Sequence, residues 1–195
     1  MQPIARTDYR KLSLAEAAAE AEAVTRDAQG AFGKLTGAQL NWKPSADAWS
    51  VGQCLEHLIV INHEMFVPLD RVIEGRQRMS WWEQMPYLPR LFGGIMVKAV
   101  SPETKQKLKA PSTARPSTSA IDAQIVSHFV AHQHELAGRL QELEKYEVDK
   151  ISVTSPFIAL ITYSVLDACR LIVAHERRHL QQAERVTQTP GFPPQ

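Results

Sequence analysis

Four helix-capping signals, each at the start of a long segment with helical periodicity, constrain the fold of this 195-residue chain most strongly. In a capping box, a Ser or Thr hydroxyl accepts a hydrogen bond from the N3 amide, and the N3 Glu or Gln returns one to the cap. This pattern, or its Asp variant, predicts helices over about 13–35, 50–75, 119–146 and 164–189. Helices of this length are typical of bundles.

Apolar residues within these segments recur three and four positions apart, as Leu136, Leu140 and Leu143 do in the third segment. This spacing gives each helix one face to bury. Four such faces close most simply into one core, so the sequence predicts an all-α four-helix bundle. The length suits a single domain that spans residues 1–195.

The connections between the predicted helices differ in length. Residues 36–49 form a loop whose two tryptophans are expected to pack over one end of the bundle. Residues 76–118 form a long insertion between the second and third helices, and we predict an extra short helix near 79–100 because structureless links of this length are unusual. The stretch SPFIALITY, 155–163, fits either a short strand or a buried connector.

Composition excludes several classes of protein. The chain has 22 Lys and Arg against 21 Asp and Glu, and the basic residues are interspersed with acidic ones, which argues against nucleic-acid binding. The longest apolar stretch, 87–100, is interrupted and falls short of the roughly 20 residues that a bilayer span needs. No secretory signal is visible at the N-terminus, so we expect a cytoplasmic protein.

Cys54 and Cys169 are expected to be buried free thiols.

Pairs of histidines suggest metal chemistry. His175 and His179 are four positions apart on the last predicted helix, so both rings can face one ion. A catalytic zinc site uses three protein ligands and keeps one position open, so a third ligand has to come from another helix. His57 points partly inward on the second helix, but His128 and His132 form a rival pair with the same spacing. Spacing alone leaves metal ligands, core histidines and a solvated polar face as alternatives.

Three stretches of the chain resemble the DinB/YfiT-like family of metal-dependent four-helix proteins. LNWKPSADAWSVGQCLEHLIVIN, 40–62, is similar to the family's Trp-Pro loop, its Trp-Ser at a helix start and its His-Leu pair. AHERRHLQQAERV, 174–186, is similar to the family's late helix, in which His-x-x-x-His-Leu precedes Gln. SPFIALITYSVLDACRLIV, 155–173, resembles the connector and the lead into that helix. The resemblance covers most of the chain apart from about 76–118.

This resemblance implies a site and a reaction class. It implies that His57, His175 and His179 bind one divalent metal, usually zinc or nickel. Family members include transferases that act on bacillithiol or mycothiol and a thiol-dependent maleylpyruvate isomerase. We therefore expect a metal-dependent enzyme, thiol S-transferase-like or hydrolase-like, that activates a low-molecular-weight thiol or water for attack on an electrophilic small molecule. The resemblance also implies that this chain can form a homodimer. Cys54, one turn before His57, or a water is the candidate for the fourth metal position.

Charged neighbours of the histidines have simpler interpretations. Glu56 and Glu176 adjoin predicted ligands, but the side chains of adjacent helical positions point about 100° apart. We therefore expect each to be a surface charge or a group that orients a ligand without touching the metal. Arg177, Arg178 and Arg185 are expected to form a solvated face, with contact to an anionic substrate as the alternative.

Two other functional hypotheses remain at the level of sequence. One is a non-catalytic, metal-stabilised interaction or dimerisation module. A closed site with four protein ligands would favour it, as would a symmetric interface built from Trp81, Trp82, Phe92 and Ile95 in the insertion. The other is a helical protein that binds no metal.

Overall fold

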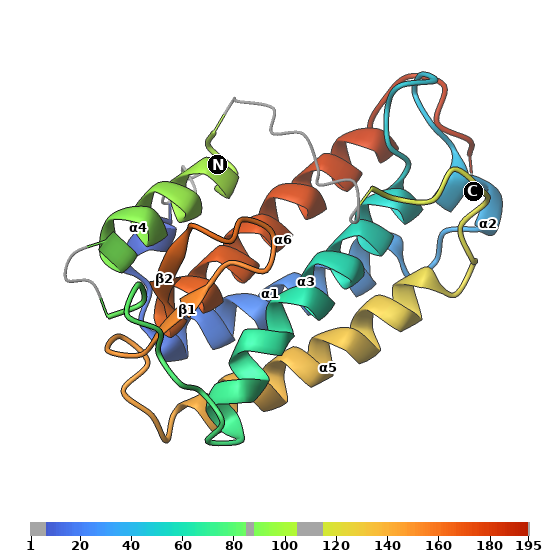
Figure 1. The fold of residues 1–195 in the computed structure, drawn as a ribbon. Coiled ribbons are helices and arrows are strands. Elements are labelled where there is room, and N and C mark those ends of the chain that lie inside the picture. Colours follow the sequence, from blue (N-terminus) through green and yellow to red (C-terminus); the bar gives the residue numbers. More distant parts are fainter. Residues whose placement is uncertain (1–6, 85–87, 105–114, 195) are drawn as a thin grey trace.

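The computed structural model describes residues 7–84, 88–104 and 115–194, and its four long helices pack side by side (Figure 1). These helices are α1 (Leu14–Phe32), α3 (Val51–Ile73), α5 (Ile125–Leu143) and α6 (Val165–Thr187). Helix α1 packs against α5 and α6, and α3 packs against the same two helices, so that α1 and α3 lie diagonally across the bundle. The predicted all-α four-helix bundle is confirmed.

The helix directions differ from those of a simple antiparallel bundle. Figure 1 shows that α1 and α6 run one way along the bundle, whereas α3 and α5 both run the other way. A short hairpin would make consecutive helices antiparallel. Because α3 and α5 are parallel, the chain has to return along the length of the bundle between Ile73 and Ile125, which a tight turn could not do.

Within the described residues, five shorter elements accompany the bundle: η1 (Tyr9–Lys11), α2 (Gly37–Asn41), α4 (Leu88–Val100), β1 (Ser152–Thr154) and β2 (Thr162–Ser164). The two strands pair antiparallel, with Val153 opposite Tyr163. Thus SPFIALITY is neither a single strand nor a buried connector, because residues 155–161 form the hairpin loop and only its end is strand. The extra helix in the insertion exists but begins at Leu88, later than predicted. It packs closely on α6, since a Cβ on Gly93 would collide with the carboxylate of Asp167.

Three of the four predicted capping signals form as expected. Ser13 and Ser50 each make the full reciprocal capping box. Ser164 accepts a hydrogen bond from the amide of Asp167 and donates its hydroxyl to the same residue's carboxylate, at 2.9 Å. These caps satisfy amides that a helix N-terminus otherwise leaves unpaired.

The predicted start of the third helix at Ser119 is wrong. Helix α5 begins at Ile125, and its N-cap residue, Gln124, makes no side-chain capping bond to the described residues. The carboxylate of Asp122 instead accepts a hydrogen bond from the Gln124 amide two residues on, at 2.9 Å. Asp readily stabilises such a turn in competition with a helical first turn. The sequence also failed to show α2, whose capping box joins Thr36 and Gln39.

The buried core has two parts. One is centred on residues such as Met65, Leu136 and Tyr163, between the hairpin and the middle of the bundle. The other contains Leu58 and Phe129, and the partly buried tryptophans of residues 36–49 pack against it, as expected. Burying a large apolar side chain stabilises the fold by about 1.5–3 kcal/mol.

Cys54 and Cys169 are both buried and unpaired, which confirms their expected role as core thiols. Burial raises the pKa of each thiol to about 12. Among the residues described, no helix is long and apolar enough to cross a lipid bilayer.

Candidate metal centre

Two helices bring together three histidines, His57 from α3 and His175 and His179 from α6. Each offers one ring nitrogen, and these nitrogens all lie within 4.8 Å of one another. The ring centroids are 4.5–5.2 Å apart, with the rings steeply inclined to each other. Such separations are short enough for one ion to reach all three nitrogens after small rotations of the rings. The described residues contain no second group of this kind.

The local structure explains why these rings meet. Helices α3 and α6 are antiparallel neighbours, and His57 lies on the inward face of α3, where it is only 2% exposed. Trp49 precedes the capping serine of α3 and forms a wall of the cluster. Its ring is nearly parallel to that of His179, at 5.6 Å, and lies 4.9 Å from that of His57. The cluster is thus screened from water on the side of the Trp49 loop.

Burial keeps the α6 histidines neutral. It lowers the pKa of His175 well below 6.5, and it lowers that of His179 to about 3, with further lowering from His57 and the Arg178 guanidinium. Neutral imidazole is the form that binds metal ions. Nδ1 of both rings is buried and has no hydrogen-bond partner within the described ranges. Because unpaired buried nitrogens are unfavourable, the donor set fits a divalent cation.

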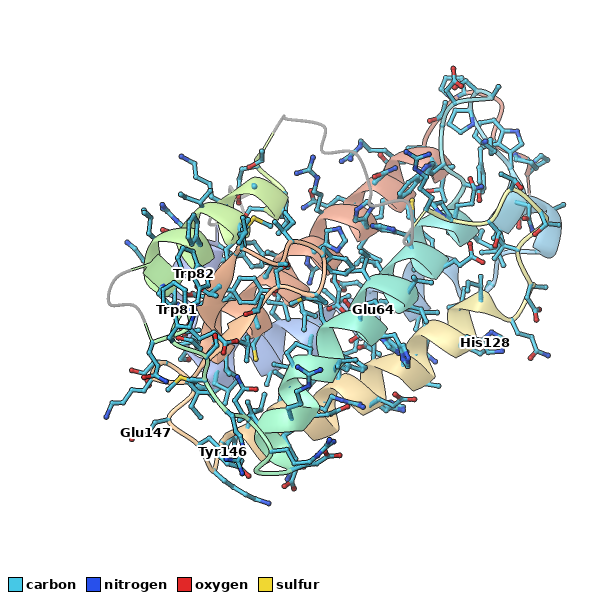
Figure 2. The ribbon with its side chains drawn as sticks, viewed as in Figure 1. Glu64, Trp81, Trp82, His128, Tyr146 and Glu147 are labelled. Carbon is cyan, nitrogen blue, oxygen red and sulfur yellow. The ribbon has the colours of Figure 1, made fainter. Side chains whose placement is uncertain are left out.

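The rival histidine pair lies elsewhere. His128 is exposed on α5, as Figure 2 shows, whereas His132 is buried and stacks on Phe66 with ring centroids 4.7 Å apart. Burial lowers the pKa of His132 to about 4. His132 is therefore a core histidine, which was one of the alternatives that the sequence left open.

Glu176 is not a surface charge, which was one of the two interpretations given for it, the other being a group that supports the ligands. It is completely buried, and its Oε1 accepts hydrogen bonds from the amides of Asn62 on α3, at 2.6 Å, and Gln133 on α5, at 2.8 Å. Burial raises the pKa of Glu176 to about 8. The residue next to His175 therefore joins three helices at the centre of the bundle. The burial of Glu176 cannot be predicted from the polar run HERRH, because it depends on Asn62 and Gln133, which are far away in the sequence.

Glu56 has a different structural role. Its carboxylate accepts hydrogen bonds from the amide and the hydroxyl of Ser117, at 2.6 and 2.7 Å. Gln53, one turn earlier, donates to the Ser117 carbonyl at 2.8 Å. These bonds fix the end of the insertion on α3, close to His57.

The arginines of α6 have separate environments. Arg177 pairs with Glu20 at 2.7 Å and with Asp27 at 2.6 Å, which ties α6 to α1 and contradicts a purely solvated role. Arg178 faces the other way and donates to the carbonyl of Ala99 at 3.0 Å. Arg185 is exposed, as expected.

The tryptophans of the insertion lie beside the hairpin (Figure 2). Trp81 is 73% exposed, its ring lies 5.5 Å from that of Trp82, and Trp82 donates its indole N–H to the carbonyl of Leu160. The tryptophan that packs against the histidine cluster is Trp49, whereas Trp81 and Trp82 pack against each other. Ile95 is also exposed, so these side chains leave an apolar surface next to α4.

Comparison with known proteins agrees with this geometry. The sequence pattern described as the DinB superfamily matches residues 20–183. The chain belongs to the DinB superfamily. It is 24% identical over 153 residues to YuaE of Bacillus subtilis (strain 168), a protein described as uncharacterized, and the match covers 78% of this chain and 85% of YuaE.

The fold resembles that of a solved structure, YfiT from Bacillus subtilis, with a TM-score of 0.59. The match covers 99% of this chain and 95% of YfiT at 16% sequence identity. YfiT is described as a probable metal-dependent hydrolase with an unusual four-helix bundle topology. At this identity the likeness concerns the fold alone.

Proposed function

We propose that this DinB-superfamily chain is a metal-dependent enzyme acting on a small molecule, with His57, His175 and His179 as the ligands of one divalent cation. The observation that carries the proposal is the convergence of three imidazoles from α3 and α6 within 4.8 Å. The description of YfiT as a probable metal-dependent hydrolase supports the same reaction class. Zinc and nickel are the proposed ions, because both suit imidazole ligands.

Three neutral ligands leave the charge of the cation uncompensated, so the ion would supply a Lewis acid able to activate water or a small thiol. The side chains around it prepare the site for this role. Trp49 covers two of the rings and excludes water on its side, which strengthens electrostatic interactions within the cluster. The hydrogen bonds of Glu176 hold the α6 backbone beside His175 in a fixed position.

Cys54 does not fit as a fourth ligand. Its side chain is buried in the core that also contains Leu58, and the group of ligand atoms that lie within 4.8 Å of one another consists of His57, His175 and His179 without the Cys54 sulfur. We therefore propose that the fourth position is left for water or substrate, as in catalytic sites with three protein ligands.

Water is the proposed nucleophile, and a low-molecular-weight thiol is the alternative. A suitable assay loads the purified protein with zinc or nickel and measures hydrolysis of p-nitrophenyl acetate, and separately measures transfer of added cysteine to 1-chloro-2,4-dinitrobenzene. We expect metal-dependent turnover in the first assay that His175→Ala abolishes. Activity only in the second assay would identify a thiol transferase.

His128→Ala is the matched control, because His128 is an exposed histidine away from the cluster. It should keep the activity of the unaltered protein. Stoichiometric metal without turnover in either assay would refute the enzymatic proposal and favour a metal-stabilised interaction module.

A further inference from the structure

Large apolar side chains that remain exposed to solvent are concentrated in one part of the molecule. Among the residues described, seven such side chains are exposed, and six of them belong to the insertion or to the β1–β2 hairpin. The six are Met79, Trp81, Leu91, Ile95, Ile158 and Leu160. Val67 on α3 is the seventh. Single exposed apolar side chains need no explanation, whereas a group of them marks an interaction surface.

The segments that carry these side chains are packed on one another. Helix α4 packs on β2, and Trp82 donates its indole N–H to the carbonyl of Leu160 in the hairpin loop, at 3.1 Å. Thr154 of β1 donates its hydroxyl to the carboxylate of Glu83, at 2.9 Å. Figure 1 shows α4 and both strands at the same end of the bundle. The six exposed side chains therefore lie on neighbouring segments, and we term them the α4–hairpin surface.

The outward face of α4 is apolar where a surface helix is normally polar. Leu91, Ile95 and Lys98 follow one another at intervals of four and three positions, and all three are exposed, so they share this face. Leu91 is 58% exposed and Ile95 is 53% exposed, whereas Val97 on the inward face is buried. Helix α4 thus presents two large aliphatic side chains to solvent, with a lysine one turn beyond them.

The insertion is also the basic part of the chain. Residues 76–118 contain eight Lys and Arg and two Asp and Glu, whereas the rest of the chain contains 14 and 19. Of the two acidic residues, Glu83 is buried and accepts hydrogen bonds from two hydroxyl groups, and Glu103 lies beyond the end of α4. Outside the insertion, Glu147 shortly before β1 pairs with Lys150. Such a charge balance favours contact with an anionic partner.

Two exposed cations adjoin the α4–hairpin surface directly. Arg78 precedes Met79 in the chain, and Lys98 shares the outward face of α4 with Ile95. Asp167, the carboxylate that α4 covers, pairs with Arg170 and so does not oppose them. The exposed apolar side chains are therefore accompanied by positive charge.

We infer that the α4–hairpin surface docks this protein peripherally on an anionic lipid bilayer. Aliphatic side chains enter the boundary of the acyl chains, tryptophan favours the headgroup region, and lysine and arginine are attracted to anionic headgroups. The protein lies on the bilayer surface, because no helix among the described residues is long and apolar enough to cross it. A second copy of this chain is a poorer occupant, since a two-fold interface brings two basic insertions together.

Co-sedimentation of the full chain with lipid vesicles tests this inference. The vesicles contain phosphatidylcholine alone, or phosphatidylcholine with phosphatidylserine as the minor lipid. We expect sedimentation with the mixed vesicles, little with phosphatidylcholine alone, and weaker binding at higher salt, because salt screens the attraction to the headgroups. EDTA should leave vesicle binding unchanged, which keeps the result independent of the proposed metal centre.

Substitutions at exposed positions measure the apolar and the charged contributions with little effect on folding. Trp81→Ala and Ile95→Ser should each weaken vesicle binding about tenfold, because each removes an apolar side chain that enters the bilayer. Lys98→Gln should weaken it about fivefold, the effect of one basic residue near an anionic membrane. Val67→Ser, on α3, and Arg26→Gln, on α1, are the matched controls and should leave vesicle binding unchanged.

Four results would overturn the inference. One is failure to sediment with the mixed vesicles, and another is equal weakening by Val67→Ser and Trp81→Ala. A third is binding that Lys98→Gln weakens but Trp81→Ala and Ile95→Ser do not, since such purely electrostatic contact suits any acidic partner, including a protein. The fourth is a dimer in lipid-free analytical ultracentrifugation that Trp81→Ala dissociates, because a second copy then covers the surface.

Discussion

Acid should destabilise this protein in part through His132, and replacing His132 with leucine should remove that part. His132 is 7% exposed, its ring stacks on Phe66, and its Nε2 has no hydrogen-bond partner among the residues that the structure describes. Burial lowers its pKa from 6.5 to about 4. The unfolded chain therefore takes up a proton at a higher pH than the folded one. The contribution of His132 to the free energy of unfolding is fully present above pH 6.5 and is lost as the pH falls through 4.

The structure sets the size of this effect. A pKa that falls from 6.5 to about 4 corresponds to about 3 kcal/mol of unfolding free energy at about 1.4 kcal/mol for each pH unit. Between pH 7.5 and pH 5.0 the protein should lose about 2 kcal/mol through this one histidine. Arg139 and His63 add to the lowering of the pKa, and Glu135 opposes it.

Urea unfolding at pH 7.5 and pH 5.0 measures this loss, with EDTA present so that metal release does not contribute. His132→Leu should lose about 2 kcal/mol less than the unaltered protein over this interval. His134→Leu, at an exposed histidine of the same helix, should keep the original pH dependence. Equal losses in the unaltered protein and in His132→Leu would refute the assignment of His132 as a buried neutral group.

Three further pairs of substitutions test contacts around the site and core by urea unfolding. Glu176→Ala should cost about 3 kcal/mol, because it leaves a cavity and two buried amides without their acceptor, whereas Glu176→Gln should cost about 1 kcal/mol; equal costs would contradict this. Glu56→Gln and Ser117→Ala should show a coupling energy of about 1 kcal/mol in a double-mutant cycle, and additive effects would mean that the contact is not formed. Leu136→Ala should cost about 3–5 kcal/mol against under about 0.5 kcal/mol for exposed Leu160→Ala, and similar costs would place Leu136 outside the core.

The sequence predicted the long helices because their signals are local. A capping serine such as Ser50 and a regular apolar spacing specify a helix within a few turns, and the structure places α1, α3 and α6 where these signals lie. The start of α5 was mispredicted because Asp122 stabilises a turn with nearly the same local pattern. The parallel direction of α3 and α5 could not be predicted, since it depends on the packing of whole helices.

The site was less accessible to sequence reasoning. The spacing of His175 and His179 is shared by His128 and His132, and no local signal shows which pair faces a third histidine. Family resemblance pointed to His57, and the structure brings its ring to the α6 pair. The sequence left open whether Glu176 is a surface charge or a group that supports a ligand, because its burial depends on amides 43 and 114 positions away in the sequence. The buried amides of Asn62 on α3 and Gln133 on α5 are the polar residues on inward helix faces that accompany it.

One divalent ion is proposed to bind to His57, His175 and His179. Elemental analysis of protein purified without a metal-affinity tag, and dialysed after exposure to zinc or nickel, tests it most directly. We predict about one ion per chain, lost in each single alanine variant of the three histidines and retained in His128→Ala. A chain without stoichiometric metal, or metal that persists in all three variants, would contradict the account.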